Sequence, residues 1–331
     1  MYETYYGLKE NPFNVTPDPK YIYLGENHQE ALAHLLYGVR ERKGFVVITG
    51  EVGSGKTTLI HCLLNKLNGN GNTKTAYLFN PRLNASDFIQ YILKDLGIEV
   101  SGEAKSDSLY TLYRYLLKAY QSNEKVVLIV DEAQGLNPEL LEEIRLLSNL
   151  ETSKSKLLQI ILVGQPELKK TLSQLKLRQL RQRVNMQYHL NPLSKKETKE
   201  YIEKRLKTAG AREKLFTEKA LKKIYQRSGG IPRLINILCD NSLLTGYALD
   251  QKTVDDKSVG EAARDLSLKS GFHRLWTWIV ISLCIVGVAL TILLLQKPGL
   301  LVPLYKGILQ SFQNIGTIAI NGFQNVLNFF K

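Results

Sequence analysis

Cysteine and acidic residues are both scarce in this 331-residue chain, and each shortage excludes classes of protein. The three cysteines, Cys62, Cys239 and Cys284, form no Cys-x-x-Cys pair, and each lies in an apolar helical pattern. Such cysteines indicate ordinary packing in a reducing compartment and argue against a zinc site or a disulfide framework. The first six residues have neither a basic start nor an apolar stretch, so the sequence predicts no secretory signal peptide there.

The shortage of acidic residues is concentrated in one segment. The chain has 44 Lys or Arg against 31 Asp or Glu, a formal net charge of +13. Residues 169–233 hold 19 of the basic residues with five Glu and no Asp, a local balance of +14. A field of that sign attracts nucleic acid, anionic lipid or an acidic partner, unless these residues simply form a solvated helical surface.

What the sequence does contain is a glycine loop between a predicted strand and a predicted helix. Residues 50–57 read Gly-Glu-Val-Gly-Ser-Gly-Lys-Thr, between an apolar run at 45–49 and an amphipathic run at 57–67. The glycines let backbone N–H groups close around a polyphosphate, and the helix N-terminus adds partial positive charge. Lys56 would reach the β- and γ-phosphates, and Thr57 would offer its hydroxyl to Mg²⁺. The pattern predicts an ATP- and Mg²⁺-binding site formed by Gly50, Glu51, Val52, Gly53, Ser54, Gly55, Lys56, Thr57 and Thr58.

Polar residues follow two further apolar runs. Asp131 and Glu132 end the run at 126–130; Asp131 would hold Mg²⁺ through water, and Glu132 would polarise the attacking water. Gln165 follows the run at 157–164. In a doubly wound sheet this strand would lie between the two previous strands, which places Gln165 near the γ-phosphate. The alternative for Gln165 is an ordinary helix start.

Arginines in two places are candidates for contact with nucleotide. Arg178 and Arg181 would share one helix face, whereas Arg183 would point elsewhere. A guanidinium clamps phosphate with two hydrogen bonds, so one of the three could reach the γ-phosphate of a neighbouring subunit. The alternative is a solvated basic helix. Arg233 begins a predicted helix after a double glycine, where it could reach back to nucleotide and couple a lid to hydrolysis.

One apolar segment has the length of a membrane span. Residues 275–295 carry no charge, with Trp276 and Trp278 at one end. As a helix they would span roughly 31 Å, which matches a bilayer core with tryptophans at its interface. Four basic residues precede it within 257–274 and two follow within 296–306. This asymmetry predicts a single-pass helix whose N-terminal side faces the cytoplasm.

Short apolar runs that alternate with helical patterns predict an α/β fold with a buried, doubly wound parallel sheet. Expected strands include 76–79, 126–130 and 157–163, and the pattern is purely helical from Ser194, with helices at 195–209, 217–227 and 232–248. The predicted domains are an aromatic and proline-rich linker segment at 1–44, a P-loop ATPase core at 45–191, a helical lid at 192–265, a transmembrane helix at 275–295 and an amphipathic extracytoplasmic tail at 299–331.

In this order the site residues resemble those of an AAA+ ATPase, and the sequence around them resembles the general secretion pathway protein A (ExeA-type) family. The similar blocks lie within residues 1 to about 265 and include 5–8, 11–13, 16–19, 28–32, 43–53, 131–134, 146–151 and 164–168. The resemblance implies that Lys56 and Thr57 contact phosphate and Mg²⁺ and that Asp131 holds Mg²⁺. It also implies that Glu132 is the catalytic base, with Gln165 at the first sensor position and Arg233 at the second. It does not choose the trans-acting arginine, for which we favour Arg183 and then Arg181.

The resemblance also implies an assembly and a location. Family members are anchored in the inner membrane with the ATPase inside, and they energise placement of an envelope channel through the peptidoglycan together with a partner membrane protein. We therefore expect a ring-type homo-oligomer at the membrane. Longer members carry a peptidoglycan-binding domain, whereas residues 296–331 are too short for one and have apolar residues at helical spacing. This tail is expected to be an amphipathic helix or a loosely ordered end.

Three alternative functions stay open at this stage. The short tail makes ATPases of pilus or exopolysaccharide export credible alternatives. A DNA-associated ATPase resembling the transposition helper proteins is favoured by the basic segment at 169–233, but those helpers are soluble and the apolar segment argues against it. The third is a scaffold that binds nucleotide as a switch and scarcely hydrolyses it, with Glu132 idle.

Overall fold

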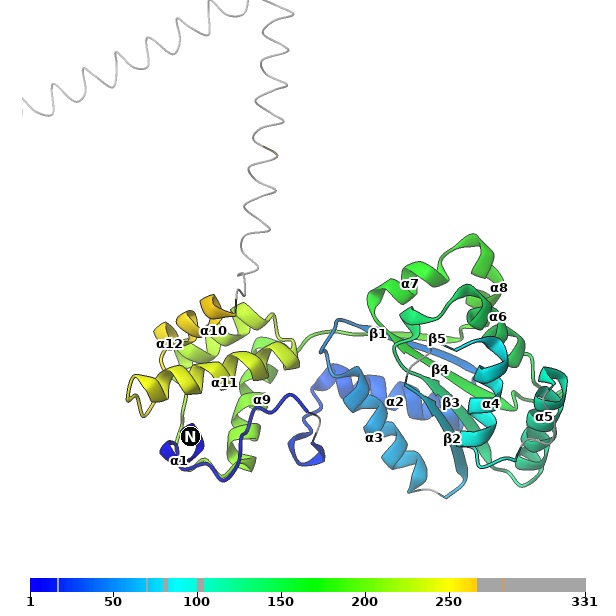
Figure 1. The fold of residues 1–331 in the computed structure, drawn as a ribbon, viewed down its shortest axis with the longest axis horizontal. Helices are drawn as coiled ribbons and strands as arrows, with labels where there is room; N and C mark the ends of the chain where they lie inside the picture. Colours follow the sequence, from blue (N-terminus) through cyan, green and yellow to red (C-terminus); the bar gives the residue numbers. More distant parts are fainter. Residues whose placement is uncertain (17, 70, 80–82, 100–103, 267–281, 283–331) are drawn as a thin grey trace, which may run out of the picture. The chain divides into compact units, whose positions relative to one another are not determined.

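The computed structural model describes residues 1–266 and residue 282, except for 17, 70, 80–82 and 100–103 (Figure 1). By contacts the chain divides into one unit at Met1–Lys269 and another at Ser270–Lys331. The predicted membrane helix at 275–295, apart from position 282, and the predicted tail at 299–331 lie outside the described residues. In the described part of the chain, no helix has the length and apolar character needed to cross a bilayer.

A parallel sheet forms the centre of the first unit, as the sequence predicts, and it has five strands. In chain order the strands are β1 (Phe45–Gly50), β2 (Thr73–Leu78), β3 (Lys125–Val130), β4 (Leu158–Gly164) and β5 (Met186–Leu190). Their order across the sheet is β2-β3-β4-β1-β5. The three inner strands are almost entirely apolar because helices cover both of their faces. β4 lies between β3 and β1, so their carboxyl ends meet at one edge.

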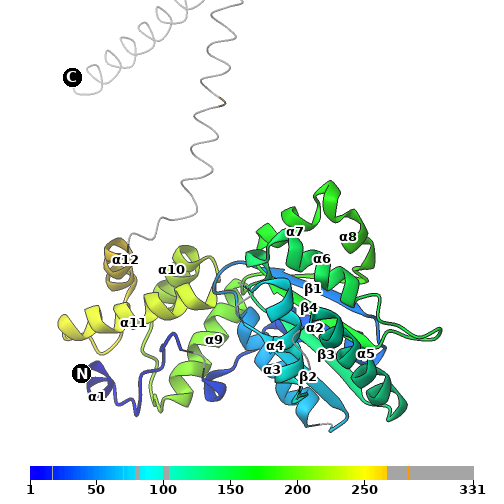
Figure 2. The ribbon, with the colours of Figure 1, turned by 45° about the vertical axis from the view of Figure 1, so that its right-hand side comes forward.

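Each face of the sheet builds its own core, since neighbouring residues of a strand point to opposite sides. Val46 and Ile48 pack with α2 (Glu26–Arg40) and α3 (Lys56–Asn68), whereas Phe45 and Val47 belong to the core of the other face. That face is covered by α4 (Ala85–Asp95), α5 (Lys105–Gln121), α6 (Pro138–Leu147), α7 (Pro166–Leu172) and α8 (Arg178–Arg183). Figures 1 and 2 both show α7 and α8 side by side.

A helical bundle follows the sheet and has a separate core. Its helices are α9 (Lys195–Thr208), α10 (Glu218–Ser228), α11 (Pro232–Ala248) and α12 (Asp256–Asp265). Ser194 and Glu197 form a capping box at the start of α9, which satisfies backbone N–H groups there. Gly229 ends α10 in the left-handed conformation that glycine adopts at low cost. We call this bundle, residues 194–265, the lid.

The N-terminal residues pack in two places. Before α2, the chain contains the short helix α1 (Tyr2–Tyr5) and the turn η1 (Pro19–Tyr21). Most aromatic residues of this stretch are buried in the lid core, and Tyr5 and Tyr23 pack against it. Arg205 of α9 holds the stretch: its guanidinium donates to the carbonyls of Pro12 at 2.5 Å and Asn14 at 3.1 Å. Helix α2 itself packs on the sheet instead.

Candidate nucleotide site

The loop between β1 and α3 has the backbone geometry that a phosphate-binding loop requires. Gly53 and Gly55 have φ values of 78° and 97°, which other residues adopt only with strain. A Cβ added to Gly53 would lie 2.5 Å from the Cβ of Arg233, and one added to Gly50 would lie 2.8 Å from the Ser54 hydroxyl. These positions therefore accept glycine alone, and the loop backbone can approach a ligand closely.

Lys56, the first residue of α3, is 6% exposed. Its Nζ donates to the carbonyls of Gly50 at 2.9 Å and Glu51 at 3.0 Å. Burial lowers the pKa of this ammonium group, and the negative charges of Glu132 and Asp131 offset part of that effect. A buried cation whose hydrogen bonds go to neutral carbonyls gains from an anionic partner, and phosphate oxygens would supply one.

Three oxygen-bearing side chains meet next to the phosphate loop. Thr57 donates its hydroxyl to Asp131 Oδ2 at 3.1 Å, and the Tyr77 hydroxyl of β2 donates to the same oxygen at 3.1 Å. Asp131 is 3% exposed and accepts a third hydrogen bond at Oδ1 from the Glu132 N–H at 2.8 Å. Burial, and then the nearby Asp131 charge, raises the pKa of Tyr77, which keeps its phenol protonated as a donor. Hydroxyl and carboxylate oxygens are the ligands that Mg²⁺ prefers.

The edge formed by β3 and β4 brings together Glu132 and Gln165, as their positions predict. Gln165 Nε2 donates to Glu132 Oε2 at 3.4 Å. Gln134 joins them: its Nε2 donates to the same Glu132 oxygen, and its Oε1 accepts from the Gln165 N–H at 2.9 Å. Gly164 leaves room for this amide, because a Cβ there would lie 2.8 Å from Gln134 Oε1. Gln134 is not among the predicted site residues, because no sequence motif indicates that its amide contacts the Glu132 carboxylate.

One cavity of about 330 Å³ collects most of the predicted residues. It is lined by Val52, Gly53, Gly55, Lys56, Thr57, Thr58, Glu132, Gln165 and Arg233, together with residues of the N-terminal stretch and the lid. The Arg233 N–H donates to the Gly53 carbonyl at 3.3 Å, so the start of α11 touches the loop. Gly50, Glu51, Ser54 and Asp131 do not line the cavity, although each lies within or contacts the loop or Thr57.

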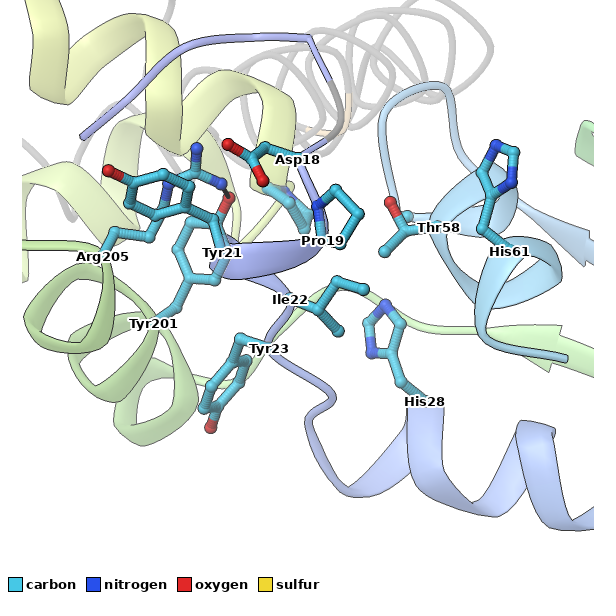
Figure 3. Close-up of a pocket in the computed structure, with 12 residues that line it drawn as sticks. Asp18, Pro19, Tyr21, Ile22, Tyr23, His28, Thr58, His61, Tyr201 and Arg205 are labelled. Atoms are coloured by element: carbon cyan, nitrogen blue, oxygen red, sulfur yellow. Dashed lines mark hydrogen bonds between the residues drawn. The ribbon is translucent and has the colours of Figure 1, made fainter. Parts of the chain in front are cut away.

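A second cavity of about 220 Å³ adjoins the first, with Gly55, Thr58, Tyr201, Arg205 and Pro232 lining both. Its remaining walls come from the N-terminal stretch and from α2 and α3. Figure 3 shows Pro19 and Ile22 facing Thr58 and His28 across it. A mainly apolar slot beside a phosphate loop suits a nucleobase. The aromatic and proline-rich composition of residues 1–44 is the sequence signal for these walls, although it also fits the predicted linker segment.

Comparison with known proteins identifies the family. Residues 39–172 match the model of a protein family described as an AAA domain. The chain is 44% identical over 279 residues to general secretion pathway protein A of Aeromonas hydrophila. This match covers 84% of the chain and 50% of that protein, so the chain spans about half the length of this relative. The chain belongs to the AAA+ proteins of the general secretion pathway protein A family.

Solved AAA+ structures share the fold. The ORC2 protein of Aeropyrum pernix is 18% identical, with 77% of this chain and 71% of that chain covered at a TM-score of 0.57. Cdc6p from Pyrobaculum aerophilum is 20% identical, with 77% and 70% covered at a TM-score of 0.60. At this level of identity the similarity concerns the fold alone.

The AAA+ fold implies a nucleotide with Mg²⁺, and the residues present fit both. A Cβ added at Gly50, Gly53 or Gly55 would lie within 3 Å of a neighbouring atom, so the loop backbone is open only to a ligand. The Lys56 ammonium donates to the loop carbonyls, and the Thr57 and Asp131 oxygens lie 3.1 Å apart. This donor set has the charge and hardness that phosphates and Mg²⁺ require.

The arginines of α8 are not part of this cavity. Within the described chain, Arg178, Arg181 and Arg183 are absent from its lining. Arg181 is exposed and donates to the Ser173 carbonyl at 3.4 Å, and Arg183 is half-buried. An AAA+ protein could use such arginines only at the nucleotide of another subunit, so their role stays a prediction.

Proposed function

We propose that the protein is a Mg²⁺-dependent ATPase, anchored in the inner membrane, that drives assembly or operation of a secretion or export apparatus of the cell envelope. The observation that carries the enzymatic part is the convergence of Lys56, Thr57, Glu132, Gln165 and Arg233 on one cavity. The cellular part rests on the similarity to general secretion pathway protein A and on the apolar segment at 275–295.

The side chains divide the work of phosphoryl transfer to water. Lys56 would exchange its loop carbonyls for β- and γ-phosphate oxygens, Thr57 would hold Mg²⁺ through its hydroxyl, and Asp131 would hold it through water. When bound, Mg²⁺ supplies charge neutralisation on the phosphates. Glu132 accepts a proton from the attacking water, and the Gln165 amide orients that water or senses the γ-phosphate.

The lid completes the site. Arg233 lies at the start of α11, next to the phosphate loop, and its guanidinium is exposed for contact with phosphate. The base would enter the cavity between Ile22, His28 and Pro232, where the lid, the N-terminal stretch and α2 all supply walls. Because the lid and the core at 45–191 would both contact one nucleotide, hydrolysis would change how the lid packs on that core.

The exposed or half-buried arginines of α8, which lie outside the nucleotide cavity, support a proposal of ring assembly. Arg183, or Arg181 if Arg183 does not act, would supply positive charge to the γ-phosphate of the adjoining subunit. We propose a homo-oligomeric ring with a partner membrane protein. Nucleic acid is a less favoured partner, since several lid cations are already paired with acidic side chains, as in Lys199–Glu218 at 2.6 Å and Lys223–Asp256 at 3.7 Å.

The enzymatic proposal is tested on the full chain reconstituted in lipid vesicles by measuring phosphate release. Lys56→Ala should abolish release and ATP binding, and Glu132→Gln should abolish release while binding persists. Lys66→Ala, at the exposed end of the same helix, is the matched control and should behave like wild type. Wild-type rates in Lys56→Ala would refute the ATPase assignment. Unchanged release in Glu132→Gln would favour the nucleotide switch instead.

The cellular proposal has its own test. The full chain should sediment with membranes and resist extraction by alkaline carbonate, whereas deletion of residues 275–295 should release it. Recovery of the intact chain in the soluble fraction would overturn the anchoring part and leave the enzymatic part standing.

A further inference from the structure

We propose that His28 is a positioning residue for phosphate binding: from behind the phosphate loop it holds the Ser54–Gly55 peptide so that the loop presents a backbone N–H to the phosphates. This inference rests on the proposed function, since it concerns nucleotide binding at the same loop. His28 lies within the block 28–32 that resembles the family, but neither the phosphate-loop motif nor the predicted site includes it.

The contact between His28 and the loop is direct and buried. His28 is 3% exposed, and its Nε2 lies 2.9 Å from the Ser54 carbonyl oxygen. A carbonyl only accepts hydrogen bonds, so Nε2 carries the hydrogen and donates it. Nδ1, the other ring nitrogen, is then the one without a hydrogen, and it is buried with no hydrogen-bond partner in the described chain.

Peptide geometry turns this contact into an orientation of the loop. The C=O and N–H of a trans peptide point in opposite directions, and no described peptide bond is cis. Because the Ser54 carbonyl is held toward α2, the Gly55 N–H of the same peptide faces the other way. Gly55 lines the cavity that contains Lys56 and Thr57, and loop N–H groups are the ligands that phosphates use at such sites.

The anchor is rigid and fits this glycine. α2 packs on the sheet through Ala31, Leu32 and Leu35, each at most 5% exposed. A Cβ on Gly55 would lie 2.9 Å from His28 Nε2, so the imidazole edge fills the place of a side chain. Gly55 has φ 97°, a conformation that costs free energy in any other residue, and the hydrogen bond to the preceding carbonyl helps to hold it.

The decisive experiment separates hydrogen-bond donation from packing. Glutamine places its amide nitrogen near the position of His Nε2, asparagine places it near Nδ1, and methionine fills the volume without a donor. We therefore compare His28→Gln, His28→Asn and His28→Met in the full chain in lipid nanodiscs, with folding checked by circular dichroism. Binding of ATP and of inorganic tripolyphosphate is measured by calorimetry.

The proposal expects His28→Met and His28→Asn to bind both ligands about tenfold more weakly, equivalent to about 1.4 kcal/mol, and His28→Gln to stay within about threefold of wild type. Tripolyphosphate is the critical ligand because it has no base. Its affinity therefore depends on the phosphate loop and not on the cavity for the base, which His28 also lines. Equal affinity of His28→Met and wild type would overturn the proposal. So would Gln binding as weakly as Asn, or a loss confined to ATP.

Failure of the proposed function gives a different result. If wild type itself binds neither ATP nor tripolyphosphate, the nucleotide site is wrong and His28 has no phosphate to position. If wild type binds and all three variants bind as well as it does, the nucleotide site stands and only the role of His28 falls. If His28→Met does not fold, the comparison of the Gln and Asn variants decides by the same criteria.

Discussion

Gln134 should control how fast the proposed base works without affecting how tightly nucleotide binds. Its amide donates to Glu132 Oε2 and accepts from the Gln165 N–H at 2.9 Å, so one side chain connects the ends of β3 and β4. Gln134 itself does not line the nucleotide cavity, whereas Glu132 and Gln165 do. Gln134→Leu preserves the volume approximately and removes both hydrogen bonds.

The magnitude follows from the bond to the carboxylate. A hydrogen bond to a charged group contributes about 1.5–3 kcal/mol, and the lower end applies because Glu132 is exposed to solvent. Gln165 Nε2 remains as a second, longer donor at 3.4 Å and preserves part of the orientation. About 1.5 kcal/mol corresponds to a roughly tenfold lower kcat. Loss of the base itself in Glu132→Gln should cost more, roughly 100- to 10,000-fold.

The assay is steady-state phosphate release by the full chain, with ATP affinity measured separately. We expect kcat to fall about tenfold in Gln134→Leu and the Kd for ATP to change less than twofold. The double variant Glu132→Gln/Gln134→Leu should be no slower than Glu132→Gln, because Gln134 acts through the carboxylate. Gln121→Leu, at the exposed end of α5, is the control for adding a leucine.

Two results would refute this reasoning. If kcat of Gln134→Leu stays within twofold of wild type, the amide does not position the base. If the fold reductions in kcat caused by the two substitutions multiply in the double variant, Gln134 acts independently of Glu132. The contact between them is then incidental to hydrolysis.

Three further predictions concern the surroundings of the site. Arg205→Met removes three hydrogen bonds of a buried guanidinium, so we expect about 3 kcal/mol less local stability, read as roughly 100-fold faster amide exchange in the N-terminal residues that it anchors. Gly53→Ala should weaken ATP binding at least about tenfold in calorimetry, because its Cβ would meet the lid arginine at 2.5 Å; Gly71→Ala, equally strained but unobstructed, should not. Mixing inactive Arg183→Ala and Lys56→Ala subunits should restore about a quarter of the phosphate release if the arginine acts in trans, and none otherwise.

The inner strands and the phosphate loop were predictable because their signals are local. β3 and β4 are continuous apolar runs, and the predicted 126–130 and 157–163 differ from them by only one residue at either end. The predicted helix at 232–248 coincides with α11 (Pro232–Ala248), since proline suits a first helical turn. In these elements the pattern alone determines both the type and the limits of the structure.

Edge strands were harder to predict for a physical reason. β2 was predicted at 76–79 but spans Thr73–Leu78, and β5 (Met186–Leu190) was not recognised. Both lie at the outer positions of the sheet, where side chains remain half exposed and polar residues are tolerated. Their sequences therefore lack the apolar run that identifies a strand covered on both faces.

The supporting residues of the site could not be predicted at all. Tyr77 and His28 act on residues that are 54 and 26 positions away in the chain, and Gln134 accepts from the N–H of Gln165, 31 positions away. Each of these contacts exists only because the sheet and its helices bring the partners together. Nothing in the sequence around a tyrosine in a strand or a histidine in a helix indicates which distant residue its side chain contacts. Motifs identify the residues that touch the ligand, whereas the fold determines which residues hold them.

The same logic explains how the lid can communicate with the phosphate loop. Glu197 caps two helices at once: Oε2 accepts from the Ser194 N–H at 2.8 Å at the start of α9, and Oε1 accepts from the Glu26 N–H at 2.7 Å at the start of α2. Burial opposes the charge on this carboxylate, but these hydrogen bonds hold its pKa below the ordinary value, so it stays ionised at neutral pH.

That shared cap lies in the same first turn of α2 as His28, whose imidazole holds the Ser54 carbonyl. The Arg233 N–H of the lid holds the neighbouring Gly53 carbonyl at 3.3 Å. Two adjacent loop carbonyls are thus fixed by α2, which is capped from the lid, and by α11, which belongs to the lid. A lid that moved would have to break both the Glu197 cap and the Arg233–Gly53 hydrogen bond, or else shift the loop carbonyls, and a shifted carbonyl would reorient an N–H group that the loop offers to phosphate.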